Sequence, residues 1–118
     1  MIALLFRPFS RVVKKRDFNE VFAGRARIFA GCLIGYNIVN NLGNPRLGII
    51  VSKKSAKKAV CRNRIKRQVR ESFRHVASKL PNMDIVIVAR HSASSAKNED
   101  LRQCLDQLWQ RLINSQTR

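Results

Sequence analysis

Residues 56–80, AKKAVCRNRIKRQVRESFRHVASKL, decide the fold of this chain because they predict a long helix with one buried face. Apolar side chains recur here at steps of four, four, three and four residues, which is the period of an amphipathic α-helix. They are Ile65, Val69, Phe73, Val76 and Leu80. Pro81 and Asn82 follow and end the helix. We therefore expect this stripe to pack on the core of the protein.

The opposite face of the same helix is strongly basic. Ten Lys and Arg residues and a single acid, Glu71, lie between Lys53 and Arg74. At about 100° per residue, the side chains opposite the stripe are Asn63, Arg67, Arg70 and Arg74. A solvated helix face normally mixes charges in i,i+4 pairs, whereas this face is nearly all positive. Because a guanidinium can hold two phosphate oxygens or stack on a base, the face predicts a nucleic-acid contact.

The bulk composition agrees with this expectation. The 118 residues include 24 Lys and Arg against 7 Asp and Glu, a formal net charge of +17. Such an excess of one charge opposes compaction, and a bound polyanion relieves the repulsion. Nucleic acid is the expected partner, with an anionic membrane surface as the alternative. The 45% of apolar residues suffices for a real core, and the length predicts a single domain over 1–118.

No feature of the sequence predicts export, membrane insertion or a disulfide framework. The apolar run 1–6 is too short for a signal peptide and has no charged segment before it. No other stretch approaches the ~18 apolar residues that span a bilayer. Cys32, Cys61 and Cys104 are scattered singly, which disfavours both disulfides and a zinc site. We expect a cytoplasmic protein with reduced thiols and no membrane contact.

The remaining elements predict an α+β protein. A first helix is expected over about 15–23, a strand over 27–39, and a second strand over 46–52. Turn residues between the two strands favour an antiparallel hairpin, while Gly31 and Gly35 either weaken the first strand or mark close backbone approach.

Two further elements complete the chain. Residues 84–89 read as a buried strand, and a last helix over 98–115 carries an apolar face. That face contains Leu101, Leu105, Leu108 and Leu112. The order αββαβα predicts an α/β sandwich whose sheet is covered mainly on one side.

The sequence offers no catalytic side chain and no metal ligand set. His75 and His91 have no nucleophile or carboxylate beside them in sequence. Glu99 and Asp100 suit the start of the last helix, and the other acids are isolated, so a two-metal nuclease site has no carboxylate cluster. We expect that this protein alone does not cleave RNA.

The basic helix and the loop before it resemble a known signature. Ser52-Lys53-Lys54, followed by residues 59–71 (AVCRNRIKRQVRE), is similar to the signature of the bacterial ribonuclease P protein component. Asp17-Phe18, the strand start at Pro45-Arg46 and the last helix also resemble that family, so the resemblance covers nearly the whole chain.

The resemblance implies a fold and a set of RNA contacts. The implied fold is αβββαβα with a left-handed β–α–β crossover, like the second domain of ribosomal protein S5. The implied contacts with the catalytic RNA are Arg62, Asn63, Arg64, Lys66, Arg67 and Arg70. The implied contacts with the 5′ leader of precursor tRNA are Phe18, Phe22, Tyr36, Lys53, Lys54 and Arg90.

Two of these groups have alternative interpretations from the residues themselves. Two Phe side chains at i and i+4, as at Phe18 and Phe22, are more often core than ligand contacts. Lys53 and Lys54 lie where backbone N–H groups of a helix start attract phosphate, or they form a solvated basic loop.

In function, the resemblance implies a monomeric protein subunit of a ribozyme. The RNA would supply the active site and bind Mg²⁺, and the protein would bind no cofactor itself. Its partners would be the catalytic RNA and precursor tRNA. Three other hypotheses stay open: a structural module like a ribosomal protein, a self-sufficient nuclease, and a DNA-binding helix in the major groove.

Overall fold

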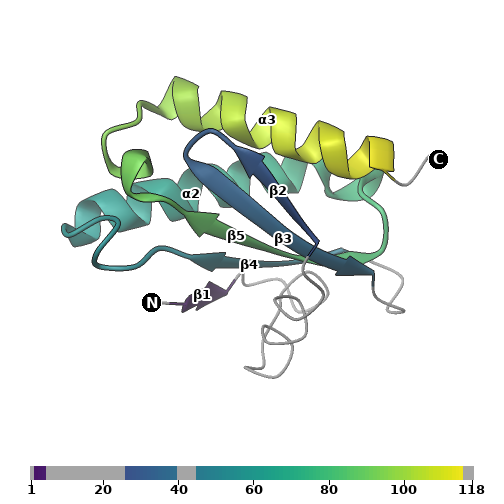
Figure 1. Ribbon diagram of the computed structural model, residues 1–118, viewed down its shortest axis with the longest axis horizontal. Coiled ribbons are helices and arrows are strands. Elements are labelled where there is room, and N and C mark those ends of the chain that lie inside the picture. The colour runs from purple at the N-terminus through teal and green to yellow at the C-terminus, as the bar shows by residue number, and fades with distance from the viewer. Residues whose placement is uncertain (1, 5–25, 40–44, 116–118) are drawn as a thin grey trace.

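A five-stranded sheet with two long helices on one side forms the part of the chain that the structure describes. The computed structural model describes residues 2–4, 26–39 and 45–115 (Figure 1). In chain order its elements are β1 (Ile2–Leu4), β2 (Arg27–Ala30), β3 (Leu33–Val39), β4 (Arg46–Ile50), α2 (Ala59–Val76), η2 (Ala77–Lys79), β5 (Met83–Ala89), η3 (His91–Ser94) and α3 (Asn98–Ser115). The α+β class predicted from the sequence is confirmed.

The strand β5 lies at the centre of the sheet. The strand order is β1-β4-β5-β3-β2, with β4 and β5 parallel and the other neighbours antiparallel. A central strand needs apolar side chains on both faces, and Ile85, Val86 and Ile87 are fully buried. The prediction of a buried strand at 84–89 is confirmed, with Met83 added at its start.

Both helices pack on the same face of the sheet, which Figure 1 shows in profile. The predicted stripe of α2 is buried at Ile65, Val69 and Phe73, and the predicted stripe of α3 is buried along its whole length. The helices also bind each other, because the Trp109 indole N–H donates to the Ser72 hydroxyl at 2.7 Å. This two-layer packing leaves the basic side of α2 facing outward.

The segment 27–39, predicted as one strand, forms two strands. The sequence predicted a single strand over 27–39, but the chain reverses at Gly31 and Cys32 and pairs β2 with β3. Gly31 has φ +57°, a left-handed conformation that side chains other than glycine rarely adopt. Gly35 marks a close approach instead, since a Cβ there would lie 2.8 Å from Leu108 Cδ2.

The predicted hairpin between 27–39 and 46–52 is wrong. The strand β5 lies between β3 and β4 and pairs with both, so β3 and β4 are not neighbours. The order αββαβα is corrected as well, since four described strands precede α2. The predicted first helix, 15–23, lies outside the described residues.

The connection β4–α2–β5 joins adjacent parallel strands, as the resemblance implied. The left-handedness of this crossover and the single domain over 1–118 stay predictions. Because β4 and β5 are parallel, their C-terminal ends lie side by side, and α2 begins just beyond the end of β4. This topology brings the residues that follow β4 close to those that follow β5.

Candidate RNA-binding surface

The outward face of α2 presents a row of polar and basic side chains. Asn63, Arg67 and Arg74 are exposed, and Arg70 is half-buried. Within the described residues, the acid beside this row is Glu71, whose carboxylate is 3.4 Å from the Arg74 guanidinium. Both of those side chains are about half exposed, so solvent weakens their attraction. The row therefore keeps its positive character.

Arg62 belongs to the predicted RNA contacts, but the structure gives its side chain an internal role. Arg62 is only 8% exposed. Its Nη1 donates to the carbonyl oxygens of Ala56 at 2.9 Å and Lys57 at 2.8 Å. No side chain caps the start of α2 at Lys58, so Arg62 fastens the preceding loop to the helix from inside. A direct RNA contact by Arg62 stays a prediction.

Arg64 also has acceptors within the protein. Its Nη1 donates to Oδ1 of Asn98 at 2.9 Å, and its Nη2 lies 3.5 Å from the carbonyl oxygen of Ser94. These bonds join α2 to η3 and to the first residue of α3. The signature therefore contains two kinds of arginine: Arg62 and Arg64 hold the helix in place, and Arg67 points to solvent.

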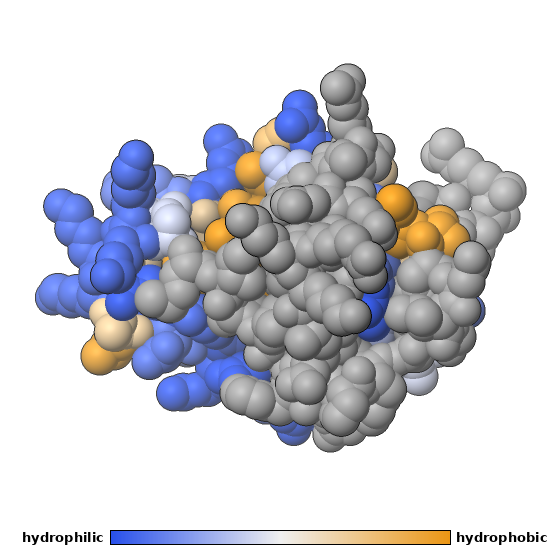
Figure 2. Space-filling model, turned by 90° about the horizontal axis from the view of Figure 1, so that it is seen from below, coloured by the Kyte–Doolittle hydropathy of each residue, from blue (hydrophilic) through white to orange (hydrophobic). Residues whose placement is uncertain are grey.

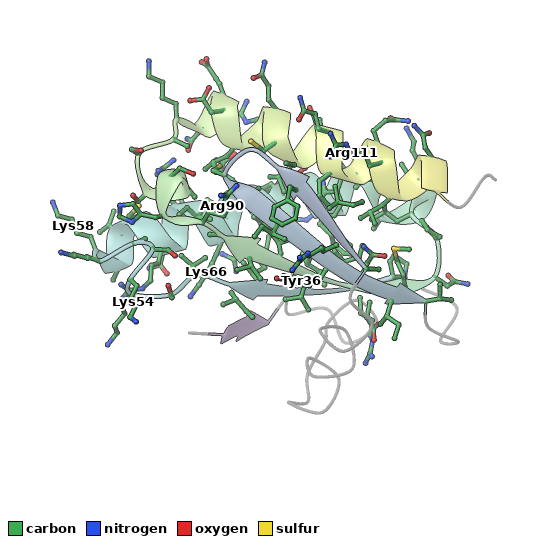
Figure 3. All side chains as sticks on the ribbon, viewed as in Figure 1. Tyr36, Lys54, Lys58, Lys66, Arg90 and Arg111 are labelled. Carbon is green, nitrogen blue, oxygen red and sulfur yellow. The ribbon has the colours of Figure 1, made fainter. Side chains whose placement is uncertain are left out.

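The loop between β4 and α2, which we name the lysine loop (residues 52–58), presents its basic side chains outward. The backbone N–H of Ser55 donates to the Ser52 hydroxyl at 3.0 Å, which closes a tight turn over the two residues between them. Those residues are Lys53 and Lys54, and both are exposed. In Figure 3, Lys54 and Lys58 extend away from the body of the molecule where α2 begins. Figure 2 shows hydrophilic side chains gathered at that same end.

The lysine loop lies beside the end of β5. A pocket of about 300 Å³ separates them, and its lining includes Lys54, Lys58, Cys61, His91 and Ser94. Arg90 directly follows the C-terminal end of β5 and is exposed. The parallel pairing of β4 with β5 thus brings Lys54 and Lys58 to one pocket with His91 and Ser94, which the sequence separates from them by more than thirty positions.

Tyr36 lies on the second face of the sheet, opposite the two helices. Its register partners are Arg27 on β2 and Val86 on β5, which resolves the register that the nearby glycines obscured in the sequence. Tyr36 is half-buried and packs around Val86 together with Ile38 and Ile50. Figure 3 shows Tyr36 on β3, with Arg90 at the end of the neighbouring strand.

A comparison with known proteins shows the family of this chain. A family model described as Ribonuclease P matches residues 6–113. The chain belongs to the ribonuclease P protein family.

Relatives within this family match nearly the whole chain. A ribonuclease P protein component from Pasteurella multocida is 47% identical over 113 residues, which cover 96% of this chain and 95% of the relative. One from Vibrio vulnificus is 53% identical over 104 residues, covering 86% of each protein.

Solved structures of family members have the same architecture. The RNase P protein of Staphylococcus aureus has a TM-score of 0.78 at 30% identity and covers 85% of this chain and 92% of its own. The RNase P protein of Thermotoga maritima has a TM-score of 0.73 at 31% identity, with 82% and 92% covered. The resemblance stated from residues 52–71 is confirmed.

Two of the predicted contact residues are not among those that the structure describes. Phe18 and Phe22 lie outside the described residues, and their leader contact stays a prediction. Sequence reasoning also missed Phe29 and Arg27, which share the second sheet face with Tyr36. Phe29 is apolar like its neighbours Ile28 and Ala30, so no polar and apolar alternation in 27–30 indicated which of these side chains faces outward.

The described residues include no cluster of side chains of the kind that binds a metal ion. Within residues 2–4, 26–39 and 45–115, no three His, Cys, Asp or Glu side chains lie close enough together to hold a metal ion. His75 and His91 are both exposed. Among the described helices, none is both long and apolar enough to cross a membrane.

Proposed function

We propose that this chain is the protein subunit of a bacterial ribonuclease P ribozyme. It binds the catalytic RNA through the outward face of α2 and binds the 5′ leader of precursor tRNA through the second sheet face and the lysine loop. In this way it assists the endonucleolytic removal of the leader, which leaves the mature tRNA 5′ end. The protein acts in the cytoplasm as a monomeric subunit.

The observation that carries this proposal is the separation of two surfaces with different chemistry. The α2 face offers exposed Arg67 and Asn63, whose guanidinium and amide suit the phosphates and 2′-OH groups of folded RNA. The sheet face offers an aromatic ring at Tyr36 with the exposed cation Arg27 as its register partner, which suits unstacked bases. One small protein can therefore contact a structured RNA and a single strand at the same time.

Charge gives the protein a second role. Catalytic RNA and precursor tRNA are both polyanions and repel each other. A protein of formal charge +17 placed between them lowers that repulsion. Stacking on aromatic side chains has little sequence preference, so one site can accept leaders of many different sequences.

Mg²⁺ is assigned to the RNA in this proposal. The described residues contain no carboxylate grouping that fits a metal ion, and the acids among them are dispersed over the fold. The chemistry of hydrolysis is likewise assigned to the RNA. The protein contributes binding and orientation of the substrate.

Reconstitution tests the proposal. Precursor tRNA is incubated at low Mg²⁺ with a bacterial ribonuclease P RNA, with this protein, or with both, and cleavage is followed on gels. We expect little cleavage with either component alone and a large increase with both. Arg67→Ala should weaken the increase, because the exposed guanidinium is part of the RNA contact. Glu71→Gln, on the same helix, removes a negative charge and no positive one, so it should not weaken the increase.

Two results would contradict the proposal in different ways. Protein that cleaves precursor tRNA without any RNA would favour a self-sufficient nuclease. Protein that binds the RNA but leaves both cleavage and the affinity for leader-bearing substrate unchanged would favour a purely structural module. Competition between structured RNA and duplex DNA at equal salt tests the DNA-binding alternative.

A further inference from the structure

Phe29 is an exposed aromatic ring with two arginine side chains near it. The side chain is 48% exposed, although it lies within a strand. The guanidinium carbon of Arg27 is 5.4 Å from the ring centroid, and that of Arg90 is 6.0 Å from it. Cations at these distances are attracted to the face of an aromatic ring. Both cations therefore attract a ring that stays about half exposed.

The position of Phe29 continues the surface that Tyr36 begins. Phe29 pairs with Ile34 on β3, and Arg27 pairs with Tyr36. Because side chains two residues apart on a strand share a face, Phe29, Arg27 and Tyr36 lie on the same side of the sheet, away from α2 and α3. Two aromatic rings on adjacent strands are therefore flanked by two guanidiniums.

The backbone under Phe29 is fastened from two sides. Arg111 of α3 donates from Nη1 to the Phe29 carbonyl oxygen at 2.8 Å. Arg90 donates from Nη1 to the Gly31 carbonyl oxygen at 3.2 Å, and its backbone N–H donates to the Cys32 carbonyl oxygen at 2.8 Å. An edge strand held in this way presents its ring in a fixed position, so a ligand that stacks on it loses little additional conformational entropy.

We propose that Phe29, Arg27 and Arg90 form a second stacking site for single-stranded RNA. One base stacks on the exposed ring, and the two guanidiniums take the phosphates on either side of that base. The proposal rests on leader binding at the second sheet face and extends it from Tyr36 to the β2 edge. Single-stranded RNA is the ligand that fits, because a duplex covers its base faces and the flanking charges demand an anion.

The test uses the reconstituted holoenzyme and a set of precursor tRNAs with 2-aminopurine at successive leader positions. Stacking on an aromatic ring quenches this fluorophore. In the wild type we expect quenching at a leader position beyond the one that contacts Tyr36. Phe29→Tyr keeps a ring and should keep the quenching. Phe29→Leu keeps an apolar side chain without a π-face and should lose it.

Affinity gives a second readout. Phe29→Leu should weaken binding of leader-bearing precursor tRNA by about 5-fold to 20-fold, the lower part of the range for one base on one ring. It should leave binding of mature tRNA unchanged. Val39→Ala removes apolar surface from an exposed side chain at the far end of β3 and is the matched control that changes neither value. Thermal unfolding verifies that each variant is folded, and Arg27→Gln, which should also weaken leader binding, replaces Phe29→Leu if that variant unfolds.

The outcomes separate this inference from the proposed function. If the wild type binds precursor and mature tRNA equally well, leader binding itself fails. If the wild type prefers precursor tRNA and Phe29→Leu retains both the preference and the quenching, the second stacking site is overturned while the proposed function stands. Loss of affinity for mature tRNA to the same extent would also overturn it, because the ring would then act only through packing.

Discussion

Arg46 and Asp84 form a bidentate ion pair that joins the two parallel strands of the sheet. Arg46 Nε donates to Asp84 Oδ1 at 2.7 Å, and Arg46 Nη2 donates to Oδ2 at 2.5 Å. The two residues are register partners at the starts of β4 and β5, and their side chains are 16% and 7% exposed. The pair therefore contributes to the alignment of these strands, on which the placement of the lysine loop beside His91 and Ser94 depends.

Asp84→Asn should strongly destabilise the protein. It replaces the carboxylate of a largely buried ion pair with a neutral amide, and breaking such a pair typically costs about 3–5 kcal/mol. Urea unfolding of the isolated protein measures the change. Glu71→Gln breaks the exposed pair with Arg74 and should change the free energy of unfolding by less than about 1 kcal/mol. Equal losses for the two variants would show that the Arg46–Asp84 pair has no special role.

Arg62 and Arg67 should differ in what they support, although both belong to the family signature. Arg62→Ala leaves the carbonyl oxygens of Ala56 and Lys57 without their donor and should cost about 1–3 kcal/mol of stability. Arg67→Ala removes an exposed side chain and should change stability by about 0.5 kcal/mol or less. Thermal or urea unfolding without RNA measures both.

In RNA affinity the order of the two variants should be the reverse of their order in stability: Arg67→Ala should lose more affinity than Arg62→Ala. The logarithm of the affinity falls as the logarithm of the salt concentration rises. If Arg67 neutralises one phosphate, Arg67→Ala makes this negative slope shallower by about 0.7–0.9. Titration of the catalytic RNA at several salt concentrations measures this slope. An unchanged slope for Arg67→Ala, or a native-like stability for Arg62→Ala, would contradict the division between anchoring and RNA-contacting arginines.

Gly35→Ala should destabilise the sheet by overpacking it against α3. The added Cβ would lie 2.8, 3.0 and 3.2 Å from Cδ2, Cδ1 and Cγ of Leu108, which is fully buried. Such overpacking typically costs about 1–3 kcal/mol. A smaller side chain in Leu108→Val should relieve part of this strain, so the double variant should lose less stability than the two single variants added together. Strictly additive losses would mean that the two positions do not touch.

The Cys32 thiol should be slow to react. Burial, together with the neighbouring Cys104 thiol, raises the pKa of Cys32 from its ordinary value of 9.0 to about 11, and the two sulfur atoms are 3.9 Å apart. Alkylation requires the thiolate, so below pH 9 Cys32 has about 100-fold less reactive species than an unperturbed thiol. Its alkylation rate should keep rising between pH 9 and pH 11. Mass spectrometry after iodoacetamide treatment measures this, and labelling of Cys32 as fast as Cys61 would contradict the prediction.

Local periodicity predicted the helices well. The last helix was expected over 98–115 and is observed over those residues, with all four predicted leucines buried. The central helix was expected from about 56 and begins at Ala59, because the Ser52–Ser55 turn and the Arg62 bonds hold the preceding residues in a loop. Helix hydrogen bonds join residues four apart, so the sequence nearby contains most of the information.

The sequence by itself determined the basic, amphipathic character of α2, the buried strand β5 and membership in the ribonuclease P protein family. Only the tertiary structure decided that β5 lies between β3 and β4, because strand pairing joins residues that are far apart in the chain. It also decided which arginines are exposed, since Arg62 and Arg67 differ in their surroundings and not in their chemistry. The same pairing placed Phe29 beside Tyr36, and no local pattern in a segment treated as one strand could have done so.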